Sequence, residues 1–243
     1  MSGYTAVSAV GRVAIGEQDT IWTPRTLRTG TCGLILLPGS GNPRAYMDNI
    51  IQPASFKLAA AMAGVGIPTI TCDFGGNSWA NDATMTAITN AWTTLKATFP
   101  AMRTDKVCLL GGSMGGGAVA RWSQLNPLST ACVVGLIPAF DLRYEFENIA
   151  GIAPAFRTAW GMGGADPFPA AADNAANYAS AVDIPLLAGY ASNDATVPPA
   201  PIIAYTESVG GTAMNLGALG HTDAAIGAMP LDTVAQFLVA HGA

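Results

Sequence analysis

The feature that most constrains the fold is the alternation of short apolar runs with amphipathic segments along the chain. Residues 31–37, 106–110 and 132–137 form mostly apolar runs, which are typical of strands buried on both faces of a sheet. Segments with helical spacing, such as residues 83–99, separate these runs. Strands that alternate with helices predict a parallel sheet whose right-handed crossovers place helices on both faces.

The rest of the chain continues this pattern. Residues 12–15 and 20–22 indicate a short antiparallel hairpin ahead of the parallel strands. Residues 141–182 have no clear place in the sheet, and a segment of that length between sheet elements is usually functional. We therefore predict a single domain over residues 1–243, in which residues 141–182 form a small cap inserted after the sixth strand. The other strands are expected at 69–72, 184–190 and 212–216, and the other helices at 53–63, 115–125 and 231–240.

Composition limits the classes of protein that fit this chain. Half of its residues are hydrophobic and only 11% are charged, yet no apolar stretch reaches the roughly 18 residues that a membrane span needs. The net charge of −5 argues against nucleic-acid binding, which usually requires a basic patch. The N-terminus lacks the basic and apolar regions of a secretory signal. We expect a soluble protein, cytoplasmic by default, without integral membrane association.

The four cysteines lie in or beside four different predicted strands. No pair has the spacing of metal ligands, so we expect no metal site, and their separation argues against disulfides. Buried thiols that act as small apolar side chains are the favoured interpretation. These residues are Cys32, Cys72, Cys108 and Cys132.

Ser113 stands where a predicted strand turns directly into a predicted helix. Gly111 and Gly115 flank it in the pattern G-x-S-x-G, in which a sharp, strained turn leaves room only for small residues. Gly112 and Gly116 are expected to relieve crowding further. The turn also puts the serine at a helix N-terminus, where partial positive charge favours a developing oxyanion. Ser113 is therefore the candidate nucleophile.

A serine hydroxyl becomes a good nucleophile only when a neighbouring base takes its proton. The chain has two histidines, and His241 lies in the C-terminal tail, so His221 in the loop after the last predicted strand is the candidate base. The third residue must accept a hydrogen bond from the imidazole. Asp194, shortly after the seventh predicted strand, is the preferred acid, with Asp141 as the main alternative and Asp223 as a weaker one.

These residues resemble the α/β-hydrolase superfamily from about residue 31 to residue 221. The resemblance rests on G-x-S-x-G after the fifth strand, on N-D-x-x-V-P at 193–198 after the seventh, and on Gly220-His221 after the eighth. The order serine, aspartate, histidine also matches this superfamily. The resemblance implies an α/β-hydrolase fold, with a mostly parallel eight-stranded sheet and an active site at the carboxyl ends of its strands.

The resemblance also suggests the groups that would stabilise an oxyanion. Many members carry a histidine–glycine pair after the third strand, where this chain has Pro38, Gly39 and Ser40. The donor at this place is a backbone N–H, which Ser40 can supply, and its hydroxyl is a further candidate donor as in cutinase-like enzymes. The backbone N–H of Met114 would supply the second donor.

Together these residues predict a serine hydrolase that cleaves carboxylic esters through an acyl-enzyme intermediate, as an esterase or lipase does. The mechanism requires neither a metal nor a cofactor, and the expected partner is a small-molecule or lipid ester. A thioesterase or a peptidase would use the same triad. A non-catalytic binding protein with the same fold is an alternative from another class, and the oligomeric state is open.

The candidate substrate-binding residues lie in the predicted cap and in the loop after the strand that ends at Cys72. Four aromatic and methionine side chains are candidates, and they are equally suited to packing the cap onto the body of the protein: Trp79, Phe156, Trp160 and Met162. The source is indicated only by composition. Eight arginines against three lysines, with abundant alanine and glycine, suggest a GC-rich genome such as that of an actinobacterium or its phage. A phage protein would be virion-associated or released at lysis.

Overall fold

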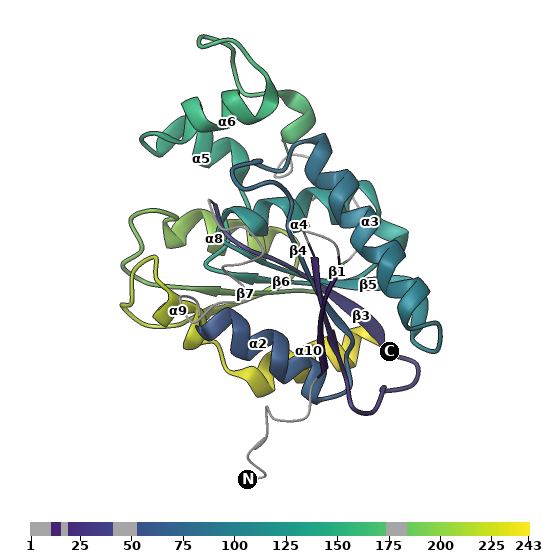
Figure 1. Ribbon diagram of the computed structural model, residues 1–243. Coiled ribbons are helices and arrows are strands. Elements are labelled where there is room, and N and C mark those ends of the chain that lie inside the picture. Colours follow the sequence, from purple (N-terminus) through teal and green to yellow (C-terminus); the bar gives the residue numbers. More distant parts are fainter. Residues whose placement is uncertain (1–10, 16–18, 41–52, 174–183) are drawn as a thin grey trace.

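The computed structural model describes residues 11–15, 19–40, 53–173 and 184–243, and its centre is an eight-stranded sheet (Figure 1). The strand order is β1-β2-β4-β3-β5-β6-β7-β8. β2 pairs antiparallel with β1 and β4, whereas the other neighbours are parallel. The predicted mostly parallel sheet and its N-terminal hairpin are confirmed. The strands are β1 (Gly11–Ile15), β2 (Asp19–Thr23), β3 (Cys32–Leu37), β4 (Thr69–Cys72), β5 (Arg103–Gly112), β6 (Thr130–Leu136), β7 (Leu186–Tyr190) and β8 (Thr212–Asn215).

Helices cover both faces of this sheet, as predicted (Figure 1). Helices α3, α4 and α8 pack on one face, and α2 and α10 pack on the other. The described helices are α2 (Pro53–Gly64), α3 (Asp82–Thr98), α4 (Met114–Leu125), α5 (Leu142–Asn148), α6 (Ile152–Trp160), α8 (Pro199–Ser208), α9 (Asp223–Gly227) and α10 (Leu231–Gly242), with the short 3-10 turns η2 (Pro127–Ser129) and η3 (Ala170–Ala172).

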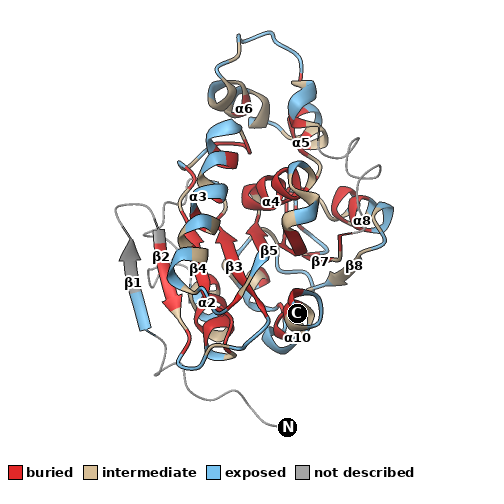
Figure 2. Ribbon diagram, turned by 90° about the vertical axis from the view of Figure 1, so that its right-hand side faces the viewer, coloured by how far each residue is buried: buried red, intermediate tan, exposed pale blue. Residues whose placement is uncertain are grey.

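Each central strand contributes to two cores. In β3, Ile35 and Leu37 join the core beneath α3 and α4, whereas Leu34 and Leu36 join the core beneath α2 and α10. Successive side chains of a strand point to opposite faces, so a strand covered on both sides must be apolar throughout. This explains the continuous apolar runs, and Figure 2 shows the central strands as the most buried part of the molecule.

The structure differs from the predicted elements in two ways: one strand begins earlier, and two helices were not predicted. β5 starts at Arg103, three residues before the predicted strand, because its polar first residues are still paired with the start of β3. The backbone N–H of Arg103 donates to the carbonyl of Thr31 at 3.0 Å. Helices α8 and α9 were not predicted. α8 begins at Pro199, a residue suited to the first helical position because the N–H it lacks would have no partner in the helix.

The segment between β6 and β7, here named the insertion (residues 142–172), carries α5, α6 and η3. It lies beyond α3, α4 and α8 from the sheet, at the top of Figures 1 and 2. Its centre is an aromatic cluster in which the ring centroids of Phe146, Phe156 and Phe168 lie 5.3–5.5 Å apart. The last part of the predicted cap, residues 174–182, lies outside the described residues.

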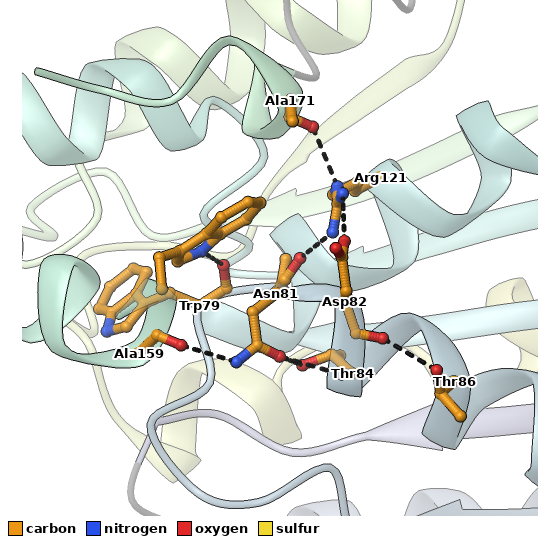
Figure 3. A network of polar contacts seen from close by, with 10 residues as sticks. Trp79, Asn81, Asp82, Thr84, Thr86, Arg121, Ala159 and Ala171 are labelled. Atoms are coloured by element: carbon orange, nitrogen blue, oxygen red, sulfur yellow. Dashed lines mark hydrogen bonds and ion pairs between the residues drawn. The ribbon is translucent and has the colours of Figure 1, made fainter. Parts of the chain in front are cut away.

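One buried arginine ties the insertion to the body of the protein (Figure 3). Arg121 of α4 donates to the carbonyls of Ala80 at 2.7 Å and Ala171 at 3.1 Å, and to the carboxylate of Asp82 at 2.8 Å. Its guanidinium also lies 4.9 Å from the ring centroid of Trp160. Ala80 belongs to the loop before α3 and Ala171 to η3, so this side chain connects three segments that are distant in sequence.

Two further expectations concern the cysteines and the membrane. All four cysteines are buried free thiols, as predicted. None of the described helices combines the length and the apolar character that crossing a bilayer would require.

Candidate active site

Ser113 lies between the end of β5 and the start of α4, with backbone angles of φ 49° and ψ −123°. Residues other than glycine rarely adopt a positive φ, so the turn is strained. Its flanking glycines are required by space. A Cβ at Gly111 would lie 2.2 Å from the carbonyl oxygen of Gly115, and one at Gly115 would lie 2.4 Å from that of Pro38. The G-x-S-x-G pattern therefore reports a real close approach of backbone segments.

The neighbouring glycines differ from each other. A Cβ at Gly116 would lie 2.3 Å from the Cβ of Pro138, so this position also requires glycine. At Gly112 the nearest atom, the carbonyl oxygen of Leu136, would be 3.9 Å away. The expectation that Gly112 relieves crowding is wrong, because a Cβ at this position would make only an ordinary van der Waals contact.

Ser113, His221 and Asp194 form one hydrogen-bonded relay. The Oγ of Ser113 lies 2.8 Å from Nε2 of His221, and Nδ1 of His221 lies 2.7 Å from Oδ2 of Asp194. Because a carboxylate only accepts hydrogen bonds, Nδ1 carries the hydrogen and Nε2 is left to accept from the serine hydroxyl. Three residues that are far apart in the sequence thus meet at the carboxyl ends of β5, β7 and β8.

Local hydrogen bonds hold the acid and the histidine loop in place. The Asp194 side chain is fully buried, and its Oδ1 accepts from the backbone N–H groups of Thr196 and Val197, both at 2.9 Å. The preceding Asn193 accepts from the backbone N–H of Gly220 at 2.6 Å, which joins the two loops directly. These contacts fix the carboxylate that accepts from the imidazole, and they tie the loop that carries His221 to the loop that carries Asp194.

The alternative acids have other contacts. Oδ1 of Asp141 accepts from the backbone N–H of Tyr144 at 2.9 Å and so caps the start of α5. Oδ2 of Asp223 accepts from the backbone N–H of Ala54 at 3.3 Å. Among the three aspartates considered, the described contact with His221 is made by Asp194.

The proposed oxyanion donors lie beside the serine. Met114 is the first residue of α4, so its backbone N–H is one of those that no helical carbonyl can satisfy. Its buried sulfur accepts a hydrogen bond from the backbone N–H of Trp79 at 3.4 Å. Ser40 is exposed at the pocket rim, and its hydroxyl donates to the side chain of Asn77. The hydroxyl proton is engaged there, which leaves the backbone N–H as the donor to consider at Ser40.

A pocket of about 280 Å³ opens at Ser113 and His221. Its described lining comes from two sides of the relay: α5 and α6 of the insertion contribute on one side, and α2 and α9 contribute on the other. Most of these side chains are apolar. Residues typical of the lining are Leu58, Trp79, Ala139, Ile152, Val197 and Ile226.

The four candidate substrate-binding residues are divided between the pocket and the insertion. Trp79 lines the pocket. Phe156 is fully buried and stacks on Trp160 at a centroid distance of 5.6 Å, and the indole N–H of Trp160 donates to the carbonyl of Trp79 at 2.9 Å. Met162 is half-buried just after α6, where its backbone N–H donates to the backbone carbonyl of Arg157. In the described structure Phe156 and Trp160 therefore pack the insertion against the body.

Glu145 of α5 also lines the pocket, although it is only 2% exposed. Burial, and to a lesser extent the nearby charges of Asp141 and Asp194, raise the pKa of Glu145 from its ordinary 4.5 to about 8. At neutral pH its side chain is therefore mostly a neutral carboxylic acid. The described residues contain no group of three or more histidine, cysteine, aspartate or glutamate side chains arranged to hold a metal ion.

No protein-family model matches this chain, and no curated protein matches it in sequence. Solved structures match its fold. The serine hydrolase FphF of Staphylococcus aureus, described as fluorophosphonate-binding, has a TM-score of 0.71 at 14% identity, over 94% of this chain and 97% of its own. Est1E from Butyrivibrio proteoclasticus has a TM-score of 0.64 at 13% identity, over 95% of this chain and 96% of its own. A truncated carbohydrate esterase from gut microbiota has a TM-score of 0.70 at 14% identity, over 92% and 90% of the two chains.

The chain has the α/β-hydrolase fold. Two residues of the site, Asn193 and Glu145, were not given a role from the sequence. The sequence did contain a signal for Asn193. An Asn-Asp pair after a strand is suited to a tight turn, and the side-chain amide of the asparagine can then reach a neighbouring loop. Glu145 gave no such signal, since a glutamate is almost always exposed to solvent unless it is paired.

Proposed function

We propose that this protein is a serine hydrolase that cleaves carboxylic esters through an acyl-enzyme intermediate. The observation that carries the proposal is the relay of Ser113, His221 and Asp194 at the mouth of a pocket. A strained turn presents the serine at a helix N-terminus, and a buried carboxylate orients the base. We further propose that the insertion acts as a cap over this pocket.

In the proposed mechanism, His221 takes the hydroxyl proton of Ser113 as the oxygen attacks the ester carbonyl. The backbone N–H groups of Met114 and Ser40 stabilise the resulting oxyanion. The alcohol leaves with the proton from His221, and the acyl group remains on the serine. The same imidazole then takes a proton from water, which attacks the acyl-enzyme and releases the acid. No step requires a metal or a cofactor.

The names of the structural neighbours support this class of reaction. One neighbour is the serine hydrolase FphF, solved with bound substrate. Two others are a carbohydrate esterase and a lipase/esterase from Lactobacillus plantarum. Est1E has also been solved with bound ferulic acid. Sequence identities of 12–15% leave the substrate of this chain open.

A fluorophosphonate probe tests the proposal, because it reacts with an activated serine. We expect labelling at Ser113 and hydrolysis of short acyl esters, both abolished in Ser113→Ala. Ser208→Ala, an exposed serine at the end of α8, is the control that should retain both. Unchanged ester turnover in Ser113→Ala would overturn the assignment, as would the absence of both labelling and turnover in the wild type.

The same assay separates the alternative reactions. An ester, a thioester and an amide of one acyl group are compared at equal concentration. Preference for the ester supports the proposal. A higher kcat/KM for the thioester or the amide indicates a thioesterase or a peptidase that uses the same relay.

A further inference from the structure

The insertion side of the pocket carries two buried polar groups whose hydrogen bonding is incomplete. Within the part of the chain that the structure describes, no group hydrogen-bonds to the carboxyl of Glu145. Trp79 lines the same pocket and is 4% exposed, and its indole N–H has no acceptor among the described residues. Buried polar groups are normally paired, and these two groups give the pocket wall a hydrogen-bonding capacity that the described residues do not use.

A ligand that supplies the missing partners is the simplest explanation. An alkyl chain placed against these groups would leave both of them unsatisfied and desolvated, which is unfavourable. The indole N–H needs an acceptor, and the neutral acid form of Glu145 both donates and accepts. A hydroxyl group can donate and accept in the same way, so it matches both.

Charged ligands fit less well. An ammonium group cannot accept a hydrogen bond from the indole of Trp79. An anion would meet the acidic residues next to Glu145, which are Asp141 at the start of α5 and Asp194 after β7. His221 of the relay is the titratable base that lines the same pocket.

The nearby cations of the insertion are engaged away from Glu145. Arg157 of α6 lies 4.8 Å from the ring centroid of Phe146 and donates to the carbonyl of Asp166. Arg143 of α5 pairs with Asp173 at 2.6 Å. No lysine or arginine is among the described lining residues. Glu145 therefore lines the pocket without a positively charged side chain of the described residues to pair with its carboxyl group.

We infer that the substrates of this protein carry a hydroxyl group on the part that enters the insertion side of the pocket, where Glu145 and the indole N–H of Trp79 hydrogen-bond to it. The inference rests on the proposed ester hydrolysis and names the class of ester: a hydroxyl-bearing ester in place of a plain alkyl ester. Glu145 is then a specificity-determining residue that contacts the substrate away from the reacting carbonyl.

The test compares pairs of esters that differ by one hydroxyl. For the alcohol part, cyclohexyl acetate is compared with the monoacetates of 1,3- and 1,4-cyclohexanediol. For the acyl part, methyl 3-phenylpropanoate is compared with its 3- and 4-hydroxyphenyl analogues. The measured quantity is the selectivity ratio, which is the kcat/KM of the hydroxylated ester divided by that of its plain partner. We expect a ratio above one for at least one pair.

Two variants test whether the selectivity ratio depends on the side chain of Glu145. Glu145→Leu removes the hydrogen-bonding groups and should lower the selectivity ratio roughly ten- to hundredfold. Glu145→Gln keeps a donor and an acceptor and should hold the ratio within about threefold of the wild-type value. Above about pH 8, where Glu145 ionises, the wild-type ratio should change, whereas that of Glu145→Gln should stay constant.

The outcomes separate this inference from the proposed function. Ratios near one for every pair, or a ratio that Glu145→Leu does not alter, overturn the inference while Ser113-dependent hydrolysis of plain esters still stands. A preference for a choline ester over its neutral 3,3-dimethylbutyl analogue also overturns it, in favour of an ammonium ligand. If Glu145→Leu does not fold, the pH dependence of the ratio in Glu145→Gln against wild type decides.

Discussion

Replacing Glu145 by glutamine should remove a large pH dependence of the protein's stability. In the folded chain the pKa of this carboxyl is raised from 4.5 to about 8, chiefly by burial. Between these values the unfolded chain has released the proton while the folded chain still holds it. Stability must therefore fall as the pH rises through this window, and it should level off above about pH 8.

The size of the effect follows from the two pKa values. Each pH unit in the window is equivalent to roughly 1.4 kcal/mol, so the interval from 4.5 to about 8 amounts to about 5 kcal/mol in total. Glutamine occupies nearly the same volume and does not titrate. The stability of Glu145→Gln relative to wild type should rise by about 4 kcal/mol between about pH 5 and pH 8.

Urea unfolding followed by tryptophan fluorescence measures this difference, at intervals of one pH unit and with equal m-values required for the comparison. Glu147→Gln, an exposed carboxylate on the same helix, is the control and should run nearly parallel to wild type. Parallel stability curves for wild type and Glu145→Gln over the whole window would refute the reasoning. Such a result would mean that Glu145 is ionised in the folded protein at neutral pH.

Three further predictions concern the site and the insertion. Asp194→Asn should reduce kcat for ester hydrolysis by about 10⁴-fold, because the amide favours the wrong imidazole tautomer, whereas Asp141→Asn should leave kcat within a few fold. Gly115→Ala should destabilise the protein strongly in thermal unfolding, since its Cβ would lie 2.4 Å from a backbone oxygen, but Gly112→Ala should be tolerated; equal losses would contradict the contact argument. Arg121→Met should cost about 3 kcal/mol by leaving buried carbonyls unpaired, against less than about 1 kcal/mol for the more exposed Arg143→Met, as measured by urea unfolding.

Most of the fold was predictable because its signals are local. A strand covered on both faces must be apolar along its whole length, so β3 and β6 are visible in the sequence wherever they lie in the sheet. The turn at Ser113 is equally local. Its glycines mark a backbone approach that any larger residue would prevent at Gly111 and Gly115. The fold class and the candidate nucleophile followed from these two kinds of pattern.

The partners of Ser113 were only partly predictable. His221 followed from the scarcity of histidines, but three aspartates suited the remaining position. Asp141 and Asp194 both follow parallel strands and so lie at the same edge of the sheet. Only the tertiary structure shows that one of them caps a helix while the other contacts the imidazole. This choice depends on loop geometry, which periodicity does not record.

The chain by itself thus determined an α/β sheet, the strand-to-helix turn at Ser113 and a short set of partners for it, because hydrophobic period and steric limits act between residues close in sequence. Only the tertiary structure decided how distant segments meet. It directed Phe156 and Trp160 into the packing of the insertion, and it buried Glu145 beside the pocket. Burial of a polar side chain depends on what covers it, and that is set by the whole fold.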